Sequence, residues 1–175
     1  MLVTTSRKPS QRTRTFCRGL ERVSKTRCVN RGKMSLRDVF LKSRELGTNL
    51  VAVISEKNGN PNGMEIYEDG VLFATLKLAA DLSLPKGRIK KDETCLRCEV
   101  DELKGLASKI FEIPLENSEE SKCNFLWIKT HQRKSTPVME FFDRDGKPTM
   151  PRIHIYECKL HDEADENTKT SRSSD

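Results

Sequence analysis

Apolar positions in the first part of the chain switch between strand and helix spacing. Leu2–Thr5 is rich in β-branched residues and predicts a short strand. A helix beginning near Pro9 would place Phe16, Leu20 and Val23 on one face. Such an apolar stripe predicts that the helix docks on a sheet.

A second strand, a second helix and a third strand follow. Residues 28–29 predict a short strand, and Ser35 is a good N-cap with Asp38 in a capping-box position. The helix should stop at Gly47, before a nearly continuous apolar run at residues 50–55. Such a run is typical of a strand covered on both faces. The β-α-β-α-β order predicts an α/β fold with some parallel pairing.

The rest of the pattern is predominantly that of strands. Residues 58–63 form a turn cluster, residues 81–100 have no clear pattern, and residues 116–122 should be a loop. We expect a hairpin, a helix and three strands at residues 64–78, 101–111, 125–129, 138–142 and 153–158. Residues 161–175 contain a single apolar residue and should form a disordered acidic tail.

Size and composition indicate one domain or two small, closely packed lobes. The chain has 175 residues, of which 35% are hydrophobic. No apolar run approaches the ~18 residues needed to cross a bilayer, and the N-terminus lacks the apolar core of a signal peptide. We therefore expect a cytoplasmic protein. Its six scattered cysteines are expected to be reduced thiols, and a disulfide framework is not expected.

Charge is strongly segregated along the sequence. Residues 1–44 contain 13 lysines and arginines against Glu21 and Asp38, a net charge of +11. The remaining 19 basic and 24 acidic residues give −5. A basic segment of this kind predicts binding to a polyanion, with phosphate backbones the leading candidate. The alternative is a solvated surface with an incidental bias.

Two N-terminal segments resemble the Brix-domain family. They are residues 4–14, TTSRKPSQRTR, and residues 30–37, NRGKMSLR, and the similarity is greatest to the short archaeal members. The resemblance implies an α/β fold of two similar lobes, roughly residues 1–80 and 81–160, each akin to an anticodon-binding domain. It also implies a role in ribosome biogenesis, with ribosomal RNA or its precursor, and other assembly factors, as partners.

The basic residues suggest how such a protein would hold RNA. Arg31 and Lys33 precede a helix N-terminus, where backbone N–H groups favour an anion, and Gly32 allows close approach of the backbone. The alternative is that Arg31 pairs with an acidic residue and Gly32 merely supplies a turn. Arginines 14, 18 and 22 recur on the outer face of the first helix. The predicted RNA-binding residues are Arg7, Lys8, Arg12, Arg14, Arg18, Arg31, Gly32, Lys33 and Arg37.

Recognition of RNA shape or backbone is expected rather than base stacking. Aromatic residues make up 6% of the chain, and Phe16, which lies among the basic residues, is assigned to the core. A second basic cluster lies between two late strands and would extend the surface. It consists of Lys129, His131, Arg133 and Lys134.

Three alternatives remain open. Cys95 and Cys98 have zinc-ligand spacing, and Cys158 with His161 would complete a tetrahedral set. An enzyme would need a site around residues such as Asp143 and Asp145, but this segment resembles a turn, and residues His131, His154 and His161 have no recognisable catalytic spacing. The third alternative is a module that binds an acidic assembly partner. We expect no catalysis, cofactor, metal or small-molecule substrate.

Overall fold

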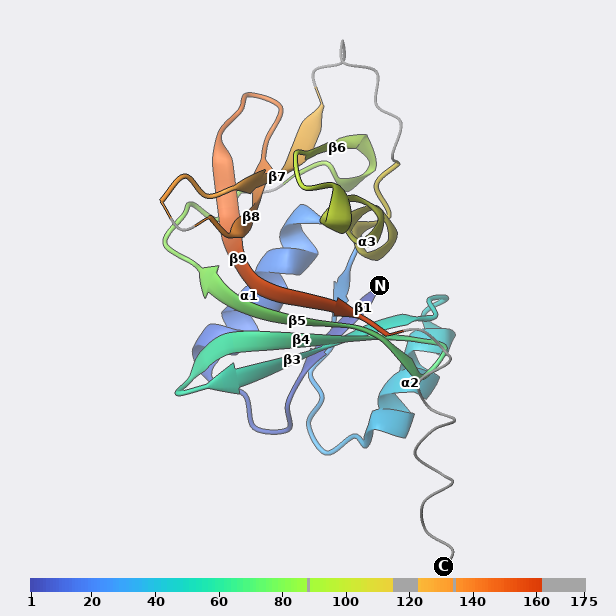
Figure 1. The fold of residues 1–175 in the computed structure, drawn as a ribbon. Helices are drawn as coiled ribbons and strands as arrows, with labels where there is room; N and C mark the ends of the chain where they lie inside the picture. The colour runs from blue at the N-terminus through green and yellow to red at the C-terminus, as the bar shows by residue number, and fades with distance from the viewer. Residues whose placement is uncertain (88, 115–122, 134, 162–175) are drawn as a thin grey trace, which may run out of the picture.

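The computed structural model describes residues 1–87, 89–114, 123–133 and 135–161. Their strands form one nine-stranded sheet in the order β2-β1-β3-β4-β5-β9-β8-β7-β6, with helices on both faces (Figure 1). The predicted α/β class is confirmed. Within these ranges, none of the helices has the length and apolar character needed to cross a membrane.

The first half of the chain forms one side of the sheet. Strand β1 pairs in parallel with both β2 and β3, as the β-α-β-α-β prediction requires, and β3, β4 and β5 form an antiparallel meander. The elements are β1 (Leu2–Thr5), α1 (Gln11–Val23), β2 (Arg27–Cys28), α2 (Leu36–Glu45), β3 (Leu50–Lys57), β4 (Asn60–Glu68) and β5 (Val71–Asp81).

The second half forms the other side of the sheet. Strand β6 pairs in parallel with β7, and β7, β8 and β9 are antiparallel. The elements are η1 (Lys91–Glu93), β6 (Thr94–Cys98), α3 (Asp101–Phe111), β7 (Asn124–Thr130), β8 (Pro137–Phe142) and β9 (Pro148–Leu160). Strand β6 was not predicted because it is an edge strand in which Leu96 alone is buried. The loop predicted at residues 116–122 lies wholly outside the described residues.

The two halves meet at the antiparallel pair of β5 and β9. The beginning of β9 pairs with β8, and residues 152–160 pair with β5. Apart from the additional β2 and α2, each half has the order strand, helix and three strands, and the sheet order is mirrored about the β5–β9 pair. The similarity of two lobes to anticodon-binding domains stays a prediction.

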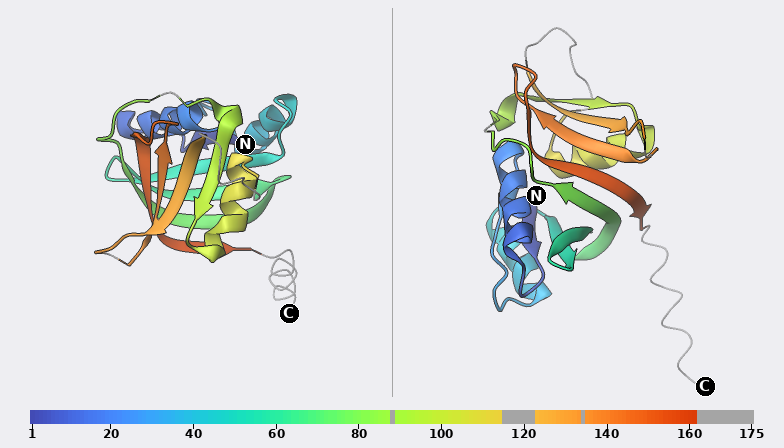
Figure 2. Two further views of the ribbon diagram at one scale, coloured as in Figure 1. Left: turned by 90° about the horizontal axis from the view of Figure 1, so that it is seen from above. Right: turned by 90° about the vertical axis from the view of Figure 1, so that its left-hand side faces the viewer.

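Helices α1 and α3 share one hydrophobic core, whereas α2 covers a separate cluster on the opposite face. The shared core takes Val3 and Ala52 from the strands, and the smaller cluster takes Leu2 and Val51. Because neighbouring strand residues point to opposite faces, both faces of β1 and β3 are buried. Figure 2 shows α1 alongside both parts of the bent sheet. The predicted covering of residues 50–55 on both faces is confirmed through Ile54.

A glycine allows α1 to pack closely on the second half of the chain. A Cβ atom on Gly19 would lie 3.1 Å from Met150 Cε and 3.2 Å from Pro151 Cδ. This contact attaches the helix to β9 as well as to the strands of its own half. Gly105, in contrast, faces open space on α3.

The start of α1 is held by a carboxylate from β3. Ser10 is the N-cap, and its side chain accepts a hydrogen bond from Thr13 N at 3.1 Å. Glu56 Oε2 accepts hydrogen bonds from Ser10 N, at 2.9 Å, and from the Thr13 hydroxyl. These hydrogen bonds, that of Thr13 foremost, hold the pKa of Glu56 below its ordinary value.

The expected disordered tail comprised residues 161–175, of which the structure describes residue 161 alone. His161 N donates to Phe73 O at 2.9 Å, and its ring contacts Thr75 Oγ1, so residue 161 is attached to β5. Residues 162–175 lie outside the described residues.

We expect Gly19→Leu to lower the free energy of unfolding by about 1–3 kcal/mol, because a larger side chain must displace Met150 and Pro151. The matched control, Gly105→Leu, should raise it by about 0.5–1 kcal/mol through helix propensity alone. Urea unfolding of both variants measures the difference. Equal effects would mean that α1 does not pack closely on β9.

We expect Glu56→Gln to lower the free energy of unfolding at pH 7 by about 1 kcal/mol, because two hydrogen bonds lose their charged acceptor. The folded-state pKa is depressed, so this stabilisation is present above the unfolded pKa of about 4.3 and is lost as pH falls through the folded pKa. The variant and the parent should therefore converge in acid. Unfolding curves at pH 7 and pH 3 test this, with the exposed Glu45→Gln as the control; an unchanged gap at pH 3 would contradict it.

Candidate nucleic-acid interface

The two basic segments of the sequence meet at one edge of the sheet. Residues 6–10 follow the carboxyl end of β1, and residues 29–35 follow the carboxyl end of its parallel neighbour β2. Val29 N donates to Val3 O at 2.9 Å, and Thr4 Oγ1 donates to Val29 O at 2.8 Å. In open α/β sheets, loops at the carboxyl ends of parallel strands commonly form ligand sites.

Two crossover connections meet at this edge and cover opposite faces of the sheet: α1 joins β1 to β2, and α2 joins β2 to β3. Strand β1 lies between β2 and β3, with α1 on one face of the sheet and α2 on the other. The starts of both helices, each with its cations, therefore flank the same edge. Arg14 and Arg18 extend the charge along α1, and both are exposed.

The turn at residues 31–34 has a structural role in addition to its charge. Gly32 has a φ of +53°, in the left-handed region, and Met34 N closes the turn on Arg31 O at 2.9 Å. Arg31 Nε donates to Met34 O at 3.2 Å. Gly32 thus supplies a turn, and Arg31 donates to a backbone carbonyl within that turn and is in none of the described ion pairs.

The predicted phosphate cradle at α2 already contains a carboxylate of the protein. Asp38 Oδ2 accepts hydrogen bonds from Ser35 N at 2.8 Å and from Ser35 Oγ at 2.7 Å, which completes the predicted capping box. These bonds, with the Ser35 hydroxyl foremost, hold the pKa of Asp38 below its ordinary value. Phosphate binding by this turn stays a prediction, and it would depend on Lys33 and Arg37 more than on helix N–H groups.

Most of the predicted cations are exposed, and all eight of them lie outside the described ion pairs. Between described residues, the ion pairs involve nine other lysines and arginines. Arg31 is half-buried. We call the set the N-terminal basic surface: Arg7, Lys8, Arg12, Arg14, Arg18, Arg31, Lys33 and Arg37.

Arg22 departs from the expected outward face of α1. It is half-buried, and its Nη1 atom is buried with no hydrogen-bond partner among the described residues. Its position near the C-terminal end of α1 is favourable for a cation because of the helix dipole. It was not among the predicted RNA-binding residues.

The second basic cluster contains one cation that is already paired. Lys129 Nζ lies 2.7 Å from Glu140 Oε2, and Arg133 lies at the rim of an open hollow of about 730 Å³. His131 also lines this hollow, and Lys134 lies outside the described residues. The cluster therefore extends along the second half of the sheet, apart from the edge formed by β1 and β2.

Aromatic side chains gather on this part of the sheet, a feature that was not predicted from the sequence. Phe125 and Phe142 stack with ring centroids 4.7 Å apart, and Trp127 lies 6.1 Å from Phe142. They alternate along β7 and β8 with core residues such as Leu126 and Phe141. This alternation of core and outward-facing residues along each strand was the sequence signal that could have predicted the aromatic residues on one face. We call the face of β6, β7 and β8 that carries these three residues the aromatic face.

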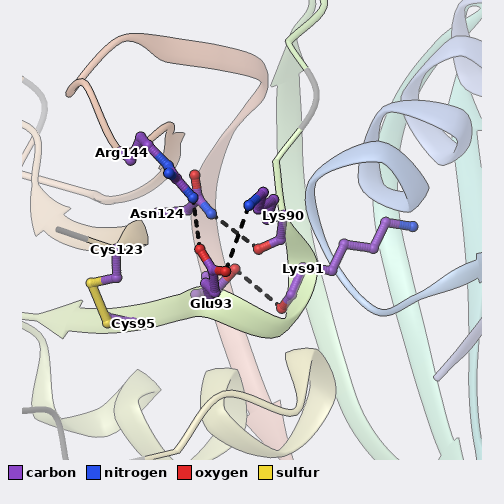
Figure 3. The surroundings of a disulfide bond; sticks show 8 residues. Lys90, Lys91, Glu93, Cys95, Cys123, Asn124 and Arg144 are labelled. Carbon is purple, nitrogen blue, oxygen red and sulfur yellow. Dashed lines mark hydrogen bonds and ion pairs between the residues drawn. A yellow bond between two sulfur atoms is a disulfide. The ribbon is translucent and has the colours of Figure 1, made fainter. Parts of the chain in front are cut away.

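The cysteine prediction is wrong for one pair. Cys95 and Cys123 form a disulfide with Cα atoms 6.2 Å apart (Figure 3). Strand β6 pairs with β7 so that Cys95 lies opposite Phe125, two residues after Cys123. The thiols of Cys17, Cys28, Cys98 and Cys158 are free, as expected.

The zinc alternative is also wrong, because Cys95 is bonded to Cys123. In addition, Cys95 and Cys98 are three residues apart on one strand and so point to opposite faces. Cys158 lies on β9 opposite Leu76 of β5, and the His161 ring contacts Thr75 of the same strand. Within the described ranges, no cluster of His, Cys, Asp and Glu side chains is arranged to hold a metal ion.

The segment around Asp143 is a turn, as its sequence indicated. Asp143 Oδ1 accepts hydrogen bonds from Asp145 N at 3.0 Å and Lys147 N at 2.8 Å, and Gly146 has a φ of +75°. The carboxylate that an RNA-cleaving site would require is thus engaged in closing the β8–β9 hairpin.

Solved structures have the same fold. The crystal structure of Mil, an archaeal Imp4-like protein, matches with a TM-score of 0.76 and 32% identity, over 92% of this chain and 99% of that one. The crystal structure of a probable ribosomal biogenesis protein from Aeropyrum pernix matches with a TM-score of 0.69, over 88% of this chain and 93% of that one. At 21% identity, the second match shows the fold alone.

Curated archaeal proteins match by sequence, although no protein-family model matches the chain. A protein from Methanothermobacter thermautotrophicus is 59% identical over 61 residues, which cover 35% of this chain and 37% of that protein. One from Methanosarcina barkeri is 45% identical over 78 residues, which cover 44% of this chain and 48% of the relative. The matched segments thus cover less than half of the length of each of these two relatives.

Both relatives are named probable Brix domain-containing ribosomal biogenesis proteins. The same name belongs to a protein from Methanococcoides burtonii that is 28% identical over 150 residues, a match that covers 95% of that protein. In addition, the chain is 32% identical to the Imp4-like protein over nearly the whole length of that protein. The chain therefore belongs to the Brix-domain family.

Proposed function

We propose that this protein is an RNA-binding factor of ribosome biogenesis, acting in ribosomal RNA processing or subunit assembly. The N-terminal basic surface would bind the phosphate backbone of ribosomal RNA or its precursor. The names of the archaeal relatives support the biological role. None of those names describes an enzyme.

The observation that carries the RNA-binding proposal is that the cations at the β1–β2 edge lie outside the ion pairs of the described residues. Exposed cations that lie close together repel one another and are stabilised by an external polyanion. Two carboxylates hold the helix starts: Glu56 of β3 bonds to the start of α1, and Asp38 bonds to the N-cap of its own helix, α2. Both accept hydrogen bonds from backbone and hydroxyl groups. The arginine and lysine side chains around them therefore remain available for phosphate.

The resemblance also supports a finer description of the architecture. We propose that residues 1–160 form two similar lobes, divided near residue 80, each akin to an anticodon-binding domain. The mirrored strand order supports this proposal.

The double variant Arg14→Ala with Arg18→Ala tests the surface. Both side chains are exposed on one face of α1, so alanine should leave the fold intact. Binding to ribosomal RNA fragments should weaken, and the slope of log affinity against log salt should flatten by about 0.7–0.9 for each phosphate that is no longer neutralised. The control is Arg44→Ala, an exposed arginine at the other end of α2.

Filter binding or anisotropy across a salt series measures these slopes. An unchanged slope in the double variant, with the parent binding RNA, would refute the role of α1. A parent that binds no RNA at low salt but captures an acidic assembly partner after nuclease treatment would favour the protein-interaction alternative.

Lys33→Ala and Arg31→Ala should separate charge from structure in the second basic segment. We expect Lys33→Ala to flatten the salt slope without changing the unfolding midpoint. Arg31→Ala should also lower the free energy of unfolding by about 1 kcal/mol, because the Met34 carbonyl loses its donor. Paired binding and thermal-unfolding measurements would contradict this assignment if the two variants behaved alike.

A further inference from the structure

The aromatic face lies opposite the side of the sheet that α3 covers. Residues of β6, β7 and β8 that face α3, among them Leu96, Leu126 and Phe141, belong to the core. Their neighbours in sequence point the other way, and the register aligns them across strands. Arg97 pairs with Trp127, which pairs with Glu140, so these three share the aromatic face.

Three of the chain's ten aromatic residues lie side by side on this face. Phe142 and Trp127 are only half-buried. The Trp127 indole N–H donates to Glu99 Oε1 at 2.9 Å, which fixes the plane of the ring. A half-buried, oriented indole ring is a good platform for a flat ligand.

Cations surround these rings. The Arg97 guanidinium lies 4.0 Å from the Phe125 ring centroid, and Lys129 Nζ lies 4.0 Å from the Trp127 ring centroid. Lys129 shares the buried Glu140 with Arg152, so Glu140 keeps one partner when Lys129 turns to another anion. Among the described ion pairs, none includes Arg97 or Arg133, which leaves two charges for a ligand.

A hollow beside Trp127 has the size and polarity for a nucleotide. Its volume of about 730 Å³ lies within the range of small-ligand sites. Thr130, His131 and Gln132 line it with hydrogen-bonding groups, and Val138 is its aliphatic contribution. Apart from Trp127 and Val138 its described lining residues are polar or charged, so the hollow is poorly suited to an apolar helix or peptide.

We propose that the aromatic face binds unpaired nucleotides of RNA, separately from the N-terminal basic surface. A base would stack on Trp127, with its edge in the hollow, while Arg97, Lys129 and Arg133 contact phosphates. The rings favour RNA over an acidic peptide, because they provide stacking surface that a peptide carboxylate does not use. The inference rests on the proposed function in that RNA is the ligand.

Trp127 is the only tryptophan in the chain, so its fluorescence reports on this face. The full chain is titrated with single-stranded A8 and U8 oligoribonucleotides, an RNA duplex of equal length, and inorganic polyphosphate as a polyanion without bases. We expect both single strands to quench the fluorescence, with little effect from the duplex or polyphosphate. Polyphosphate would still bind the N-terminal basic surface.

Variants then locate the site by anisotropy of a labelled A8 strand. Trp127→Leu should weaken binding at least about fivefold, whereas Trp127→Phe, which keeps a ring, should weaken it less. Because Trp127→Leu can disturb folding, Arg97→Ala and Arg133→Ala provide a second test. Each should flatten the salt slope by about 0.7, and Arg133→Ala, which removes no described ring contact or ion pair, should also leave the unfolding midpoint unchanged. Arg44→Ala is the matched control.

The outcomes separate this inference from the proposed function. Quenching that persists in the Arg14→Ala, Arg18→Ala variant supports a separate site for unpaired bases. Binding of A8 without quenching, or with unchanged affinity in Trp127→Leu, Arg97→Ala and Arg133→Ala, overturns the inference while the N-terminal basic surface stands. Equal quenching by polyphosphate also overturns it, because bases would then not be needed.

Discussion

The antiparallel pairing of β5 with β9 is the interaction on which the architecture depends. It joins two meanders, each begun by a parallel strand pair, into a single sheet. Backbone hydrogen bonds across this pair leave no free edge between the halves, so one core extends across both. Helix α1 can therefore belong to the first half in sequence and pack against β9 of the second.

This arrangement explains why charge ends up where it does. The apolar face of α1 is fixed by the shared core, so Arg14 and Arg18 must point to solvent. The loops that begin α1 and α2 meet because β1 and β2 are parallel neighbours, not because they are close in sequence. Carboxylates at both helix starts are held in hydrogen bonds, which leaves the surrounding cations outside the ion pairs of the described residues.

Two chemically different surfaces follow from one sheet. At the β1–β2 edge, cations that make no cation–π contact among the described residues are suited to phosphate and shape. On the opposite half, aromatic rings and cations alternate with core residues along β7 and β8, a composition suited to exposed bases. Under the two proposals, the first surface would hold a folded RNA region by its backbone and the second a neighbouring unpaired segment by its bases.

Sequence determined whatever depends on local periodicity. The strand Leu2–Thr5, the capped helix α2 and the buried strand β3 follow from spacing, capping residues and apolar runs, and so does the outward charge of Arg14 and Arg18 on α1. Tertiary structure decided what depends on partners far along the chain. Strand β6 is recognisable only beside β7, because just one of its side chains is buried, and the Cys95–Cys123 bond depends on that pairing. The aromatic face likewise exists only once β7 and β8 align, since pairing register, not composition, places Phe125, Trp127 and Phe142 together.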